Sequence, residues 1–275
     1  MGAFAFNVFS YTAIFVVIAT GLILVVQLMG LYNFAHGEFL LVGGMCCYFV
    51  QGSGMSPWAG IVLAPLAGFG VGWLADRVLL SRVYRIPTAA VLSTFAIGLA
   101  MRELSRLQLG GQYVSIEAPL PGTFEFFGVT LPVWRACVLV VCIVTGLALW
   151  LAMRHSRYGL QLRAVLDNER LARATGLKAA RINTIAFSAA AALTAGAGAL
   201  IAPVLSVHAD MGLPFLIKAF LAAVLGSAWG LGGGLAAASV IGIVSSVLPL
   251  AVDAVVADAI VLIGAVVALR FLSRN

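Results

Sequence analysis

The sequence predicts an all-α polytopic membrane protein whose residues 1–275 form a single transmembrane domain. Apolar residues make up 63% of the chain, charged residues make up 9%, and the mean hydropathy is +1.10. Soluble proteins, by contrast, carry about 25% charged residues. Apolar stretches near the ~20 residues needed to cross a bilayer recur along the chain. The alternating pattern of a membrane β-barrel is absent, so each stretch is predicted to be helical.

The apolar stretches predict about eight or nine membrane helices. Their approximate ranges are 8–30, 36–50, 58–76, 87–107, 132–153, 182–204, 214–229, 232–249 and 253–270. The segments 36–50 and 214–229 are short, which predicts broken or re-entrant helices whose freed backbone groups are satisfied by protein or by a water-filled cavity. The first segment has neither a basic start nor a small-residue cleavage site, so we expect it to be kept rather than removed as a signal peptide.

The distribution of basic residues predicts the orientation of the chain in the membrane. The loop at 154–181, called here the basic loop, carries seven of the sixteen Lys and Arg residues, and three arginines lie in 77–85. Lys and Arg are enriched on the cytoplasmic side, so both segments and the C-terminus are predicted to be cytoplasmic. The segment 110–131, which has two glutamates and no basic residue, is then extracytoplasmic. The net charge of +6 follows this topology and does not indicate nucleic-acid binding.

The sequence has none of the motifs that would make the chain an enzyme or a metalloprotein. There is no nucleotide-binding loop before Lys178 or Lys218, no zinc-protease motif and no nucleophile elbow. We therefore expect no cofactor, no metal and no ATP hydrolysis by this chain. The cysteines fit neither a zinc site nor a disulfide framework and are predicted to act as small buried hydrophobic residues. They are Cys46, Cys47, Cys137 and Cys142.

The basic loop contains a short predicted helix. Asp167 suits the N-cap, and Glu169 in the first turn complements the positive end of the helix. Gly176 suits the left-handed position that follows the helix, with Leu177 folding back on Ala172. About eight residues lie between these caps, which corresponds to about 12 Å of helix.

This short helix is predicted to present a small apolar face with a charged rim. Leu171, Ala174 and Thr175 share one face, and Arg170 and Arg173 flank it. One interpretation is a knob that docks into a groove on a partner protein. The other is a surface helix that only retains the topology. The residues alone leave both open.

A second polar cluster interrupts the apolar stretch at 28–44. Asn33, His36 and Glu38 lie there, with Gly37 among them. Ionisable groups at membrane depth are costly and usually face a cavity, a pathway or a partner. The cluster is therefore interpreted either as a helix break near a permeation path or as a solvated turn at the membrane edge.

Charged residues also occur in later apolar segments. Glu103 and Arg106 are predicted to form a local ion pair at the outer interface, next to Arg102. Lys218 opens a short apolar segment and is predicted to extend toward the lipid headgroups. Asp253 and Asp258 do not share a helical face and are predicted to be outer-end caps rather than ion ligands.

Small residues recur at four-residue spacing, which allows membrane helices to approach closely. They are Gly68 and Gly72, followed by Gly226, Gly230 and Gly234. Two interpretations are open, tight packing within one subunit and a seam between two subunits.

Four collinear stretches carry a resemblance to a known family. They are "GLYNFAHGEFLLVGG", "LSTFAIGLAMRELSRLQLGG", "RYGLQLRAVLDNERLARATGLKAARI" and "IKAFLAAVLGSAWGLGGGLAAASVIGI". Together they span about residues 20 to 245, and the chain resembles the shorter type of permease subunit of branched-chain amino-acid ABC importers. The resemblance implies the ABC importer permease fold.

The resemblance also implies partners and site residues. The partners are a second permease subunit, in this family usually a diverged one, two cytoplasmic ATPase subunits, an extracytoplasmic solute-binding protein and the lipid bilayer. The short helix corresponds to the coupling helix that inserts into the ATPase. Its implied coupling residues are Asp167, Glu169, Arg170, Leu171, Ala172, Arg173 and Gly176. The candidate path residues are Asn33, His36, Gly37, Glu38, Ser93, Thr94 and Lys218.

We therefore expect a permease subunit of an ATP-driven importer in a bacterial cytoplasmic membrane, carrying branched-chain or related amino acids. An importer of urea or short amides is an alternative within the same class. An ion-gradient-driven secondary transporter or channel is a second alternative, with Glu38, Asp253 and Asp258 as its candidate ion ligands. A membrane scaffold that transports nothing is the third.

Overall fold

The computed structural model describes residues 2–83, 86–126 and 128–272 of the chain. Its α-helices are α1 Gly2–Met29, α2 His36–Gly52, α3 Pro57–Ala75, α4 Ser81–Val83, α5 Pro87–Leu109, α6 Val133–His155, α7 Arg157–Asp167, α8 Glu169–Ala174, α9 Ala179–Leu205, α10 Leu213–Gly226, α11 Gly230–Val247 and α12 Ala254–Leu272. A π-helical turn, η1 Asp76–Leu80, joins α3 to α4. Two 3₁₀ turns, η2 Ser227–Trp229 and η3 Leu248–Leu250, flank α11.

A helix lies at each of the predicted apolar stretches. Among the residues that the structure describes, five helical segments are long and apolar enough to cross a membrane: Gly2–Gln27, Pro57–Val83, Val133–His155, Ala179–Leu205 and Gly230–Leu250. The predicted short segments correspond to α2, with 17 residues, and α10, with 14. At 1.5 Å per residue these two helices extend over only about 20–26 Å, less than the ~30 Å of a bilayer core.

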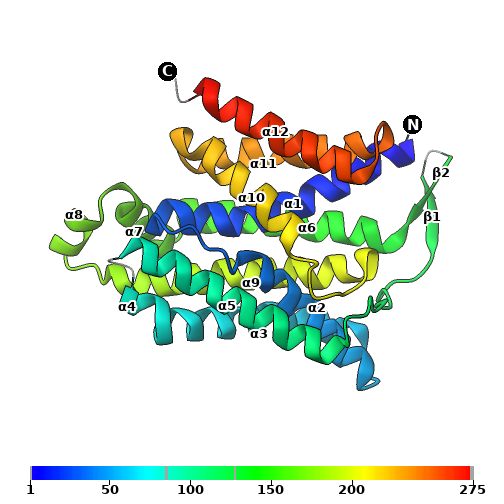
Figure 1. Cartoon of the computed structure of the whole chain (residues 1–275), viewed down its shortest axis with the longest axis horizontal. Helices are drawn as coiled ribbons and strands as arrows, with labels where there is room; N and C mark the ends of the chain where they lie inside the picture. The colour runs from blue at the N-terminus through cyan, green and yellow to red at the C-terminus, as the bar shows by residue number, and fades with distance from the viewer. Residues whose placement is uncertain (1, 84–85, 127, 273–275) are drawn as a thin grey trace.

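The helices form an elongated bundle in which α9 is central. It packs against α1, α2 and α3, while α11 packs against α1 and α10. The N-terminus lies at one end of the bundle, and α8 lies at the other (right and left in Figure 1). Half of the buried residues of α9 are alanine, and Gly198 lies among them, so neighbouring helices can approach its backbone closely.

The glycine spacings serve packing within the chain. A Cβ at Gly68 or Gly72 would meet Ala195 or Ala191 of α9, so these glycines let α3 lie against α9. Gly226 likewise lies against the backbone at 233–234, where α10 meets α11. Gly230 departs from the predicted stripe, because it takes a left-handed φ of +64° at the start of α11 instead of packing between helices.

The all-α prediction is wrong in one region, at the N-terminal end of the bundle. Within 110–131, β1 Thr123–Phe126 pairs with β2 Val129–Pro132 in an antiparallel hairpin. An isolated bridge also joins Val114 to Val207. The strands have four residues each, too short for alternation to stand out against the prolines and glycines of this segment.

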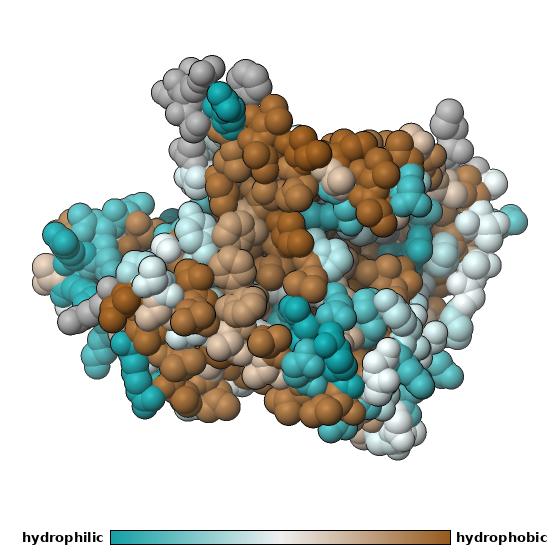
Figure 2. Space-filling model, viewed as in Figure 1, coloured by the Kyte–Doolittle hydropathy of each residue, from teal (hydrophilic) through white to brown (hydrophobic). Residues whose placement is uncertain are grey.

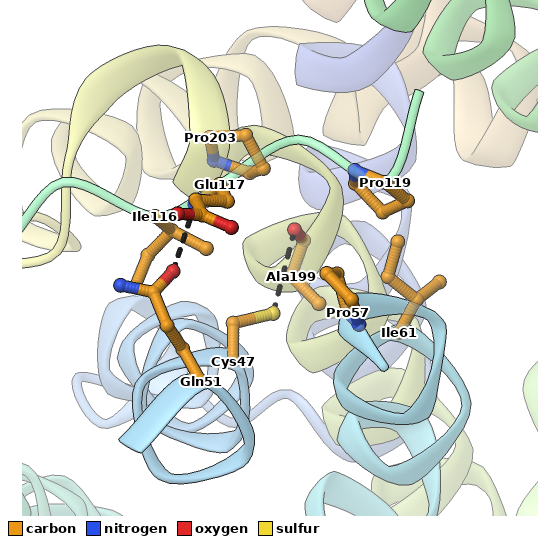
Figure 3. A pocket seen from close by; sticks show the side chains of 9 residues that line it. All are labelled: Cys47, Gln51, Pro57, Ile61, Ile116, Glu117, Pro119, Ala199 and Pro203. Carbon is orange, nitrogen blue, oxygen red and sulfur yellow. Dashed lines mark hydrogen bonds between the residues drawn. The ribbon is translucent and has the colours of Figure 1, made fainter. Parts of the chain in front are cut away.

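The segment before the hairpin is fixed to the bundle. Gln51 at the end of α2 donates to the carbonyl of Ser115 (3.1 Å) and accepts from the backbone N–H of Glu117 (2.8 Å). Figure 3 shows the gap that this segment encloses above α2, α3 and α9. Its volume of about 10 Å³ has room for one water, so it is not a solute site.

The surface has the polarity expected of a membrane protein. Apolar side chains cover the middle of the bundle, and hydrophilic residues gather at the end that holds α8 (Figure 2). The cysteines behave as predicted, because all four are free and lie buried or half-buried. Within the described residues, no cluster of His, Cys, Asp and Glu could hold a metal ion.

Candidate functional site

Helix α2 begins inside the bundle, beside the middle of two long helices. His36, its first residue, is 1% exposed. Its Nε2 donates to the carbonyl oxygen of Ile18 in α1 at 2.9 Å and lies 3.2 Å from Oγ1 of Thr194 in α9. Because Ile18 and Thr194 both lie near the centres of their helices, the chain after Met29 turns back into the protein before α2 starts. A solvated turn at the membrane edge does not have this burial or these neighbours.

Polar side chains satisfy the backbone of this break. Oδ1 of Asn33 accepts from the N–H of Ala35 at 3.0 Å, and Oγ1 of Thr94 in α5 accepts from the N–H of Phe34 at 3.2 Å. Asn33 is 1% exposed and Thr94 is fully buried. An unsatisfied backbone group at this depth costs several kcal/mol, so these side chains allow α2 to begin there.

The start of α2 contacts the start of α10. A Cβ at Gly37 would overlap the carbonyl of Gly212, and a Cβ at Gly212 would overlap the carbonyl of Gly37. Gly212 is the residue before α10. The two short helices therefore begin side by side, which only glycine at both positions allows.

An ion network links these helix starts to α5. Glu38, fully buried in the first turn of α2, pairs with Arg102 of α5, whose Nε donates to Oε1 at 3.1 Å. Asp210, just before α10, lies 3.8 Å from Arg102 and accepts from Arg106 at 3.0 Å. The predicted pair of Glu103 with Arg106 is present at 2.7 Å. Negative charge at the start of α2 also suits the positive end of its helix dipole.

Sequence reasoning missed one residue and one pairing of this arrangement. Asp210 was missed, although a lone acidic residue in a short connection between apolar segments is itself a signal. The partner of Glu38 was also missed, because Arg102 is 64 residues away in the chain.

Of the two remaining candidate path residues, one lies near the break and the other lies on α10. Ser93 is half-buried on α5 next to Thr94. Lys218 is buried on α10, and its Nζ lies 2.7 Å from Oδ1 of Asp258 on α12. Lys218 therefore does not extend to the headgroups and Asp258 is not an end cap, in contrast to the prediction. Asp253 does cap α12, since its Oδ1 accepts from the N–H of Val255 at 2.9 Å.

The basic loop folds into α7 and α8, and the predicted short helix is present with one corrected cap. Asn168 is the N-cap of α8, and its Oδ1 accepts from the N–H of Leu171 at 3.0 Å. Asp167 is instead the last residue of α7, which runs further than predicted. Helix α8 has six residues and is therefore shorter than the predicted segment.

The C-terminal end of α8 agrees with the prediction. Gly176 takes a φ of +87°, and the N–H of Leu177 donates to the carbonyl of Ala172 at 3.1 Å, which closes the helix end. Ala172 is 4% exposed and packs with residues of α7 and α9. Leu171 and the neighbouring Ala174 and Thr175 are exposed, as predicted for a free face.

Helix α7 holds α8 in place against α9. Tyr158 of α7 donates to the carbonyl of Ile182 in α9 at 3.0 Å, and burial raises the pKa of its hydroxyl to about 12. Leu162 and Val165 of α7 are buried with Ala172 in the same apolar cluster. On α8 itself, Arg173 and Glu169 form an i, i+4 ion pair at 2.6 Å.

Comparison with known proteins identifies the family. Residues 4–269 match the family model described as "Branched-chain amino acid transport system / permease component". The chain belongs to this family. It is thus an ABC importer permease, a multi-pass transport subunit rather than an enzyme.

Relatives of the permease include transporters of different solutes. It is 26% identical to the high-affinity branched-chain amino acid transport system permease protein LivH of Salmonella typhimurium, over 86% of this chain and 82% of the relative. It is also 26% identical to the corresponding protein BraD of Pseudomonas aeruginosa, over 83% and 80%. The ribose import permease protein RbsC of Escherichia coli is 25% identical over 80% and 68%.

A solved structure shares the fold of the permease. The structure described as PsaBC from Streptococcus pneumoniae in complex with Fab superposes with a TM-score of 0.54, over 98% of this chain and 90% of that chain. The sequence identity is 14%, so this likeness extends to the fold alone. Membership in the permease family also supports the predicted ATP-driven importer over the alternative of an ion-gradient-driven transporter.

Proposed function

We propose that this permease imports branched-chain or related amino acids across a bacterial cytoplasmic membrane. The whole chain is one transmembrane domain that works with a second, diverged permease subunit, two ATPases and an extracytoplasmic binding protein. In this orientation the basic loop and the C-terminus face the cytoplasm, because positive residues concentrate there. The amino-acid substrate is supported by the transport systems to which the LivH and BraD relatives belong.

The observation that carries the proposed path is the break before α2. Glu38, Arg102 and Asp210 place charges of both signs beside it, and Arg102 and Asp210 are partly exposed. Groups of both signs complement a zwitterionic amino acid better than a neutral sugar. In the proposed mechanism, the inward and outward openings alternate around this break, and Asn33, His36 and Thr94 keep the backbone satisfied.

The uptake experiment uses the tagged chain, purified with its partners and reconstituted in proteoliposomes that contain ATP. We expect ATP-dependent uptake of radiolabelled leucine in the presence of the binding protein, and none of ribose. Uptake of ribose alone would show that the permease carries a sugar. Uptake of urea or acetamide alone would show that it carries short amides, as in the alternative given above. Leucine uptake that needs no ATP and stops with an uncoupler would contradict the ATP-driven proposal.

We propose further that α8 is the contact with the ATPase. Its support is geometric, since Ala172 anchors the helix while Leu171, Arg170 and Arg173 are exposed. Reversing the charges in Arg170→Glu/Arg173→Glu is expected to abolish ATP-driven uptake without loss of folding. Unchanged uptake would contradict the docking role.

A charge-swapped variant separates recognition from helix stability. Glu169→Arg/Arg173→Glu keeps an i, i+4 pair, worth about 0.3–0.5 kcal/mol, but reverses its direction on the surface. Because both swapped charges oppose the helix dipole, hydrogen exchange of the amides at 169–177 is measured beside uptake to establish that the helix persists. If the ATPase recognises α8, this variant loses coupling although the helix persists. Normal uptake in the swapped variant would show that Arg170→Glu/Arg173→Glu acts by destabilising α8 and not by disrupting a contact with the ATPase.

A further inference from the structure

A large groove opens beside α8, where α3 and η1 face the start of α9. Its volume is about 1080 Å³. The lining residues on the α3 side are Phe69, Trp73, Arg77 and Ser81, and those on the α9 side include Lys178, Arg181, Asn183, Thr184 and Ile185. Met29 at the end of α1 and Glu169 and Arg173 of α8 complete it. This groove is separate from the break before α2.

The wall formed by α3 and η1 changes from apolar to polar along one stripe. Phe69, Trp73, Arg77 and Ser81 follow at four-residue intervals, so they lie on one face. Phe69 and Trp73 are 39% and 45% exposed, and the guanidinium of Arg77 lies 5.9 Å from the centroid of the Trp73 ring. From Phe69 to Arg77 the stripe rises about 12 Å, the distance from the acyl region to the headgroups of one leaflet.

The opposite wall has the same order. Ile185 and Arg181 of α9 and Lys178, the residue before it, follow at intervals of four and three residues toward the end that holds α8. Gly68 lies against Ala195 and Gly72 against Ala191, so α9 runs antiparallel to α3 here. The basic residues of both walls therefore lie at the same end of the groove, and the apolar residues lie deeper. The groove is therefore amphipathic along the membrane normal.

The basic end of the groove carries uncompensated positive charge. Arg77, Lys178 and Arg181 make no ion pair with any residue in the described ranges. Arg173 is paired with Glu169, and the buried Asp76 behind the wall accepts from Thr184 at 2.5 Å. Even with both carboxylates counted, the four basic residues exceed the two acidic ones.

A residue with a buried, unpaired acceptor also belongs to the lining of this groove. Asn183 is 8% exposed, and its Oδ1 has no hydrogen-bond partner among the described residues. An unpaired buried amide oxygen is unfavourable, so the place of Asn183 in the lining indicates a donor supplied from the groove.

We propose that this groove binds one anionic phospholipid with a hydroxyl-bearing headgroup, the chemical class of phosphatidylglycerol. Arg77, Lys178 and Arg181 hold the phosphate, and Asn183 accepts from a headgroup hydroxyl. An acyl chain covers Phe69 and Trp73. Basic pockets between membrane helices are suited to anionic headgroups. The lipid then lies against Glu169 and Arg173 of α8, so its binding also stabilises the position of that helix.

The test is a lipid titration of the delipidated full complex in neutral detergent, read by native mass spectrometry. Dioleoylphosphatidylglycerol is expected to bind at least about tenfold more tightly than dioleoylphosphatidylcholine, since the charge of each basic residue contributes about fivefold. Inorganic phosphate and glycerol phosphate, which lack acyl chains, are expected to compete only weakly. Equal binding of the two lipids would overturn the proposal, and so would full competition by phosphate, which would assign a free-anion site.

Variants locate the binding in the groove. Arg77→Gln/Arg181→Gln is expected to weaken phosphatidylglycerol binding by about 25-fold, and Arg77→Lys/Arg181→Lys, which keeps the charge, by no more than about threefold. Arg157→Gln is the matched control, because Arg157 is exposed on α7 outside the groove lining. An equal loss in the control would place the binding elsewhere. If the glutamine variant fails to fold, Asn183→Leu, expected to weaken binding severalfold, decides the outcome instead, and unchanged binding in Asn183→Leu would place the lipid elsewhere.

Discussion

The carboxylate of Glu38 on α2 accepts a hydrogen bond from the Nε of Arg102 on α5 at 3.1 Å, although the two residues are 64 positions apart. Glu38 is fully buried, whereas the side chain of Arg102 is 18% exposed. The pair therefore connects a helix that begins inside the bundle to one that packs at its surface. Asp210 extends the connection to the start of α10.

Removing the charge of Glu38 should destabilise the protein. In Glu38→Gln, Arg102 loses its buried partner but still lies near Asp210 and remains partly exposed to solvent. We therefore expect a loss of about 1–3 kcal/mol, less than the 3–5 kcal/mol of a fully buried pair. The thermal unfolding midpoint in detergent measures this. Glu103→Gln is the control, because it changes an exposed pair worth at most about 1 kcal/mol.

A double variant tests whether the two groups act together. Glu38→Gln/Arg102→Gln leaves no uncompensated charge at this position. The double variant should therefore lose less stability than the sum of the losses in Glu38→Gln and Arg102→Gln. Additive losses would show that Glu38 and Arg102 stabilise the protein independently.

Close packing of α2 on α9 gives a second prediction. A Cβ at Gly198 would overlap the carbonyl of Leu40, whereas a Cβ at Gly196 would meet only Pro65 at 3.8 Å. Gly198→Ala should therefore cost at least about 1–3 kcal/mol through overpacking. Gly196→Ala, on the same helix, should be neutral or stabilising by up to about 1 kcal/mol. Unfolding midpoints that fall equally would contradict the close backbone contact between α2 and α9.

The sequence predicted the helices well because apolar length is a local property. Each predicted stretch contains a helix, and the shortness of 36–50 and 214–229 corresponds to α2 and α10. What could not be predicted depends on contacts between distant residues. The pairs Glu38–Arg102 and Lys218–Asp258 join different helices, and no local pattern indicates which charges meet.

The errors near α8 have a different origin. Asp and Asn are both good N-caps, and they are adjacent at 167 and 168. Only the length of α7 decides between them, and that length depends on the burial of Leu162 and Val165 against α9. The left-handed Gly176 was predictable, because glycine at this position requires no tertiary information.

The pair of Lys218 and Asp258 gives a third prediction. Asp258→Asn leaves a buried ammonium without its partner, so we expect a loss of about 1–3 kcal/mol, reduced from the fully buried case because Asp258 is half-exposed. Asp253 lies just before α12, and Asp253→Asn keeps a side chain that can cap this helix. This variant should therefore lose less than about 1 kcal/mol of stability. Thermal unfolding of the two variants side by side provides the measurement. A larger loss in Asp253→Asn would mean that Lys218 does not depend on Asp258.

The cap of α8 gives a prediction that does not depend on the proposed docking. Asn168→Ala removes the bond to the N–H of Leu171 and should destabilise this helix by about 1 kcal/mol, or about fivefold in its local opening equilibrium. Asp167→Ala should be neutral or slightly stabilising, because a carboxylate at the last residue of α7 opposes the helix dipole. Hydrogen exchange of the amides at 169–177 measures both changes. Faster exchange in Asp167→Ala than in Asn168→Ala would show that Asp167 is the N-cap after all. Where α8 docks on the ATPase, uptake should also fall, and only in the variant whose amides exchange faster.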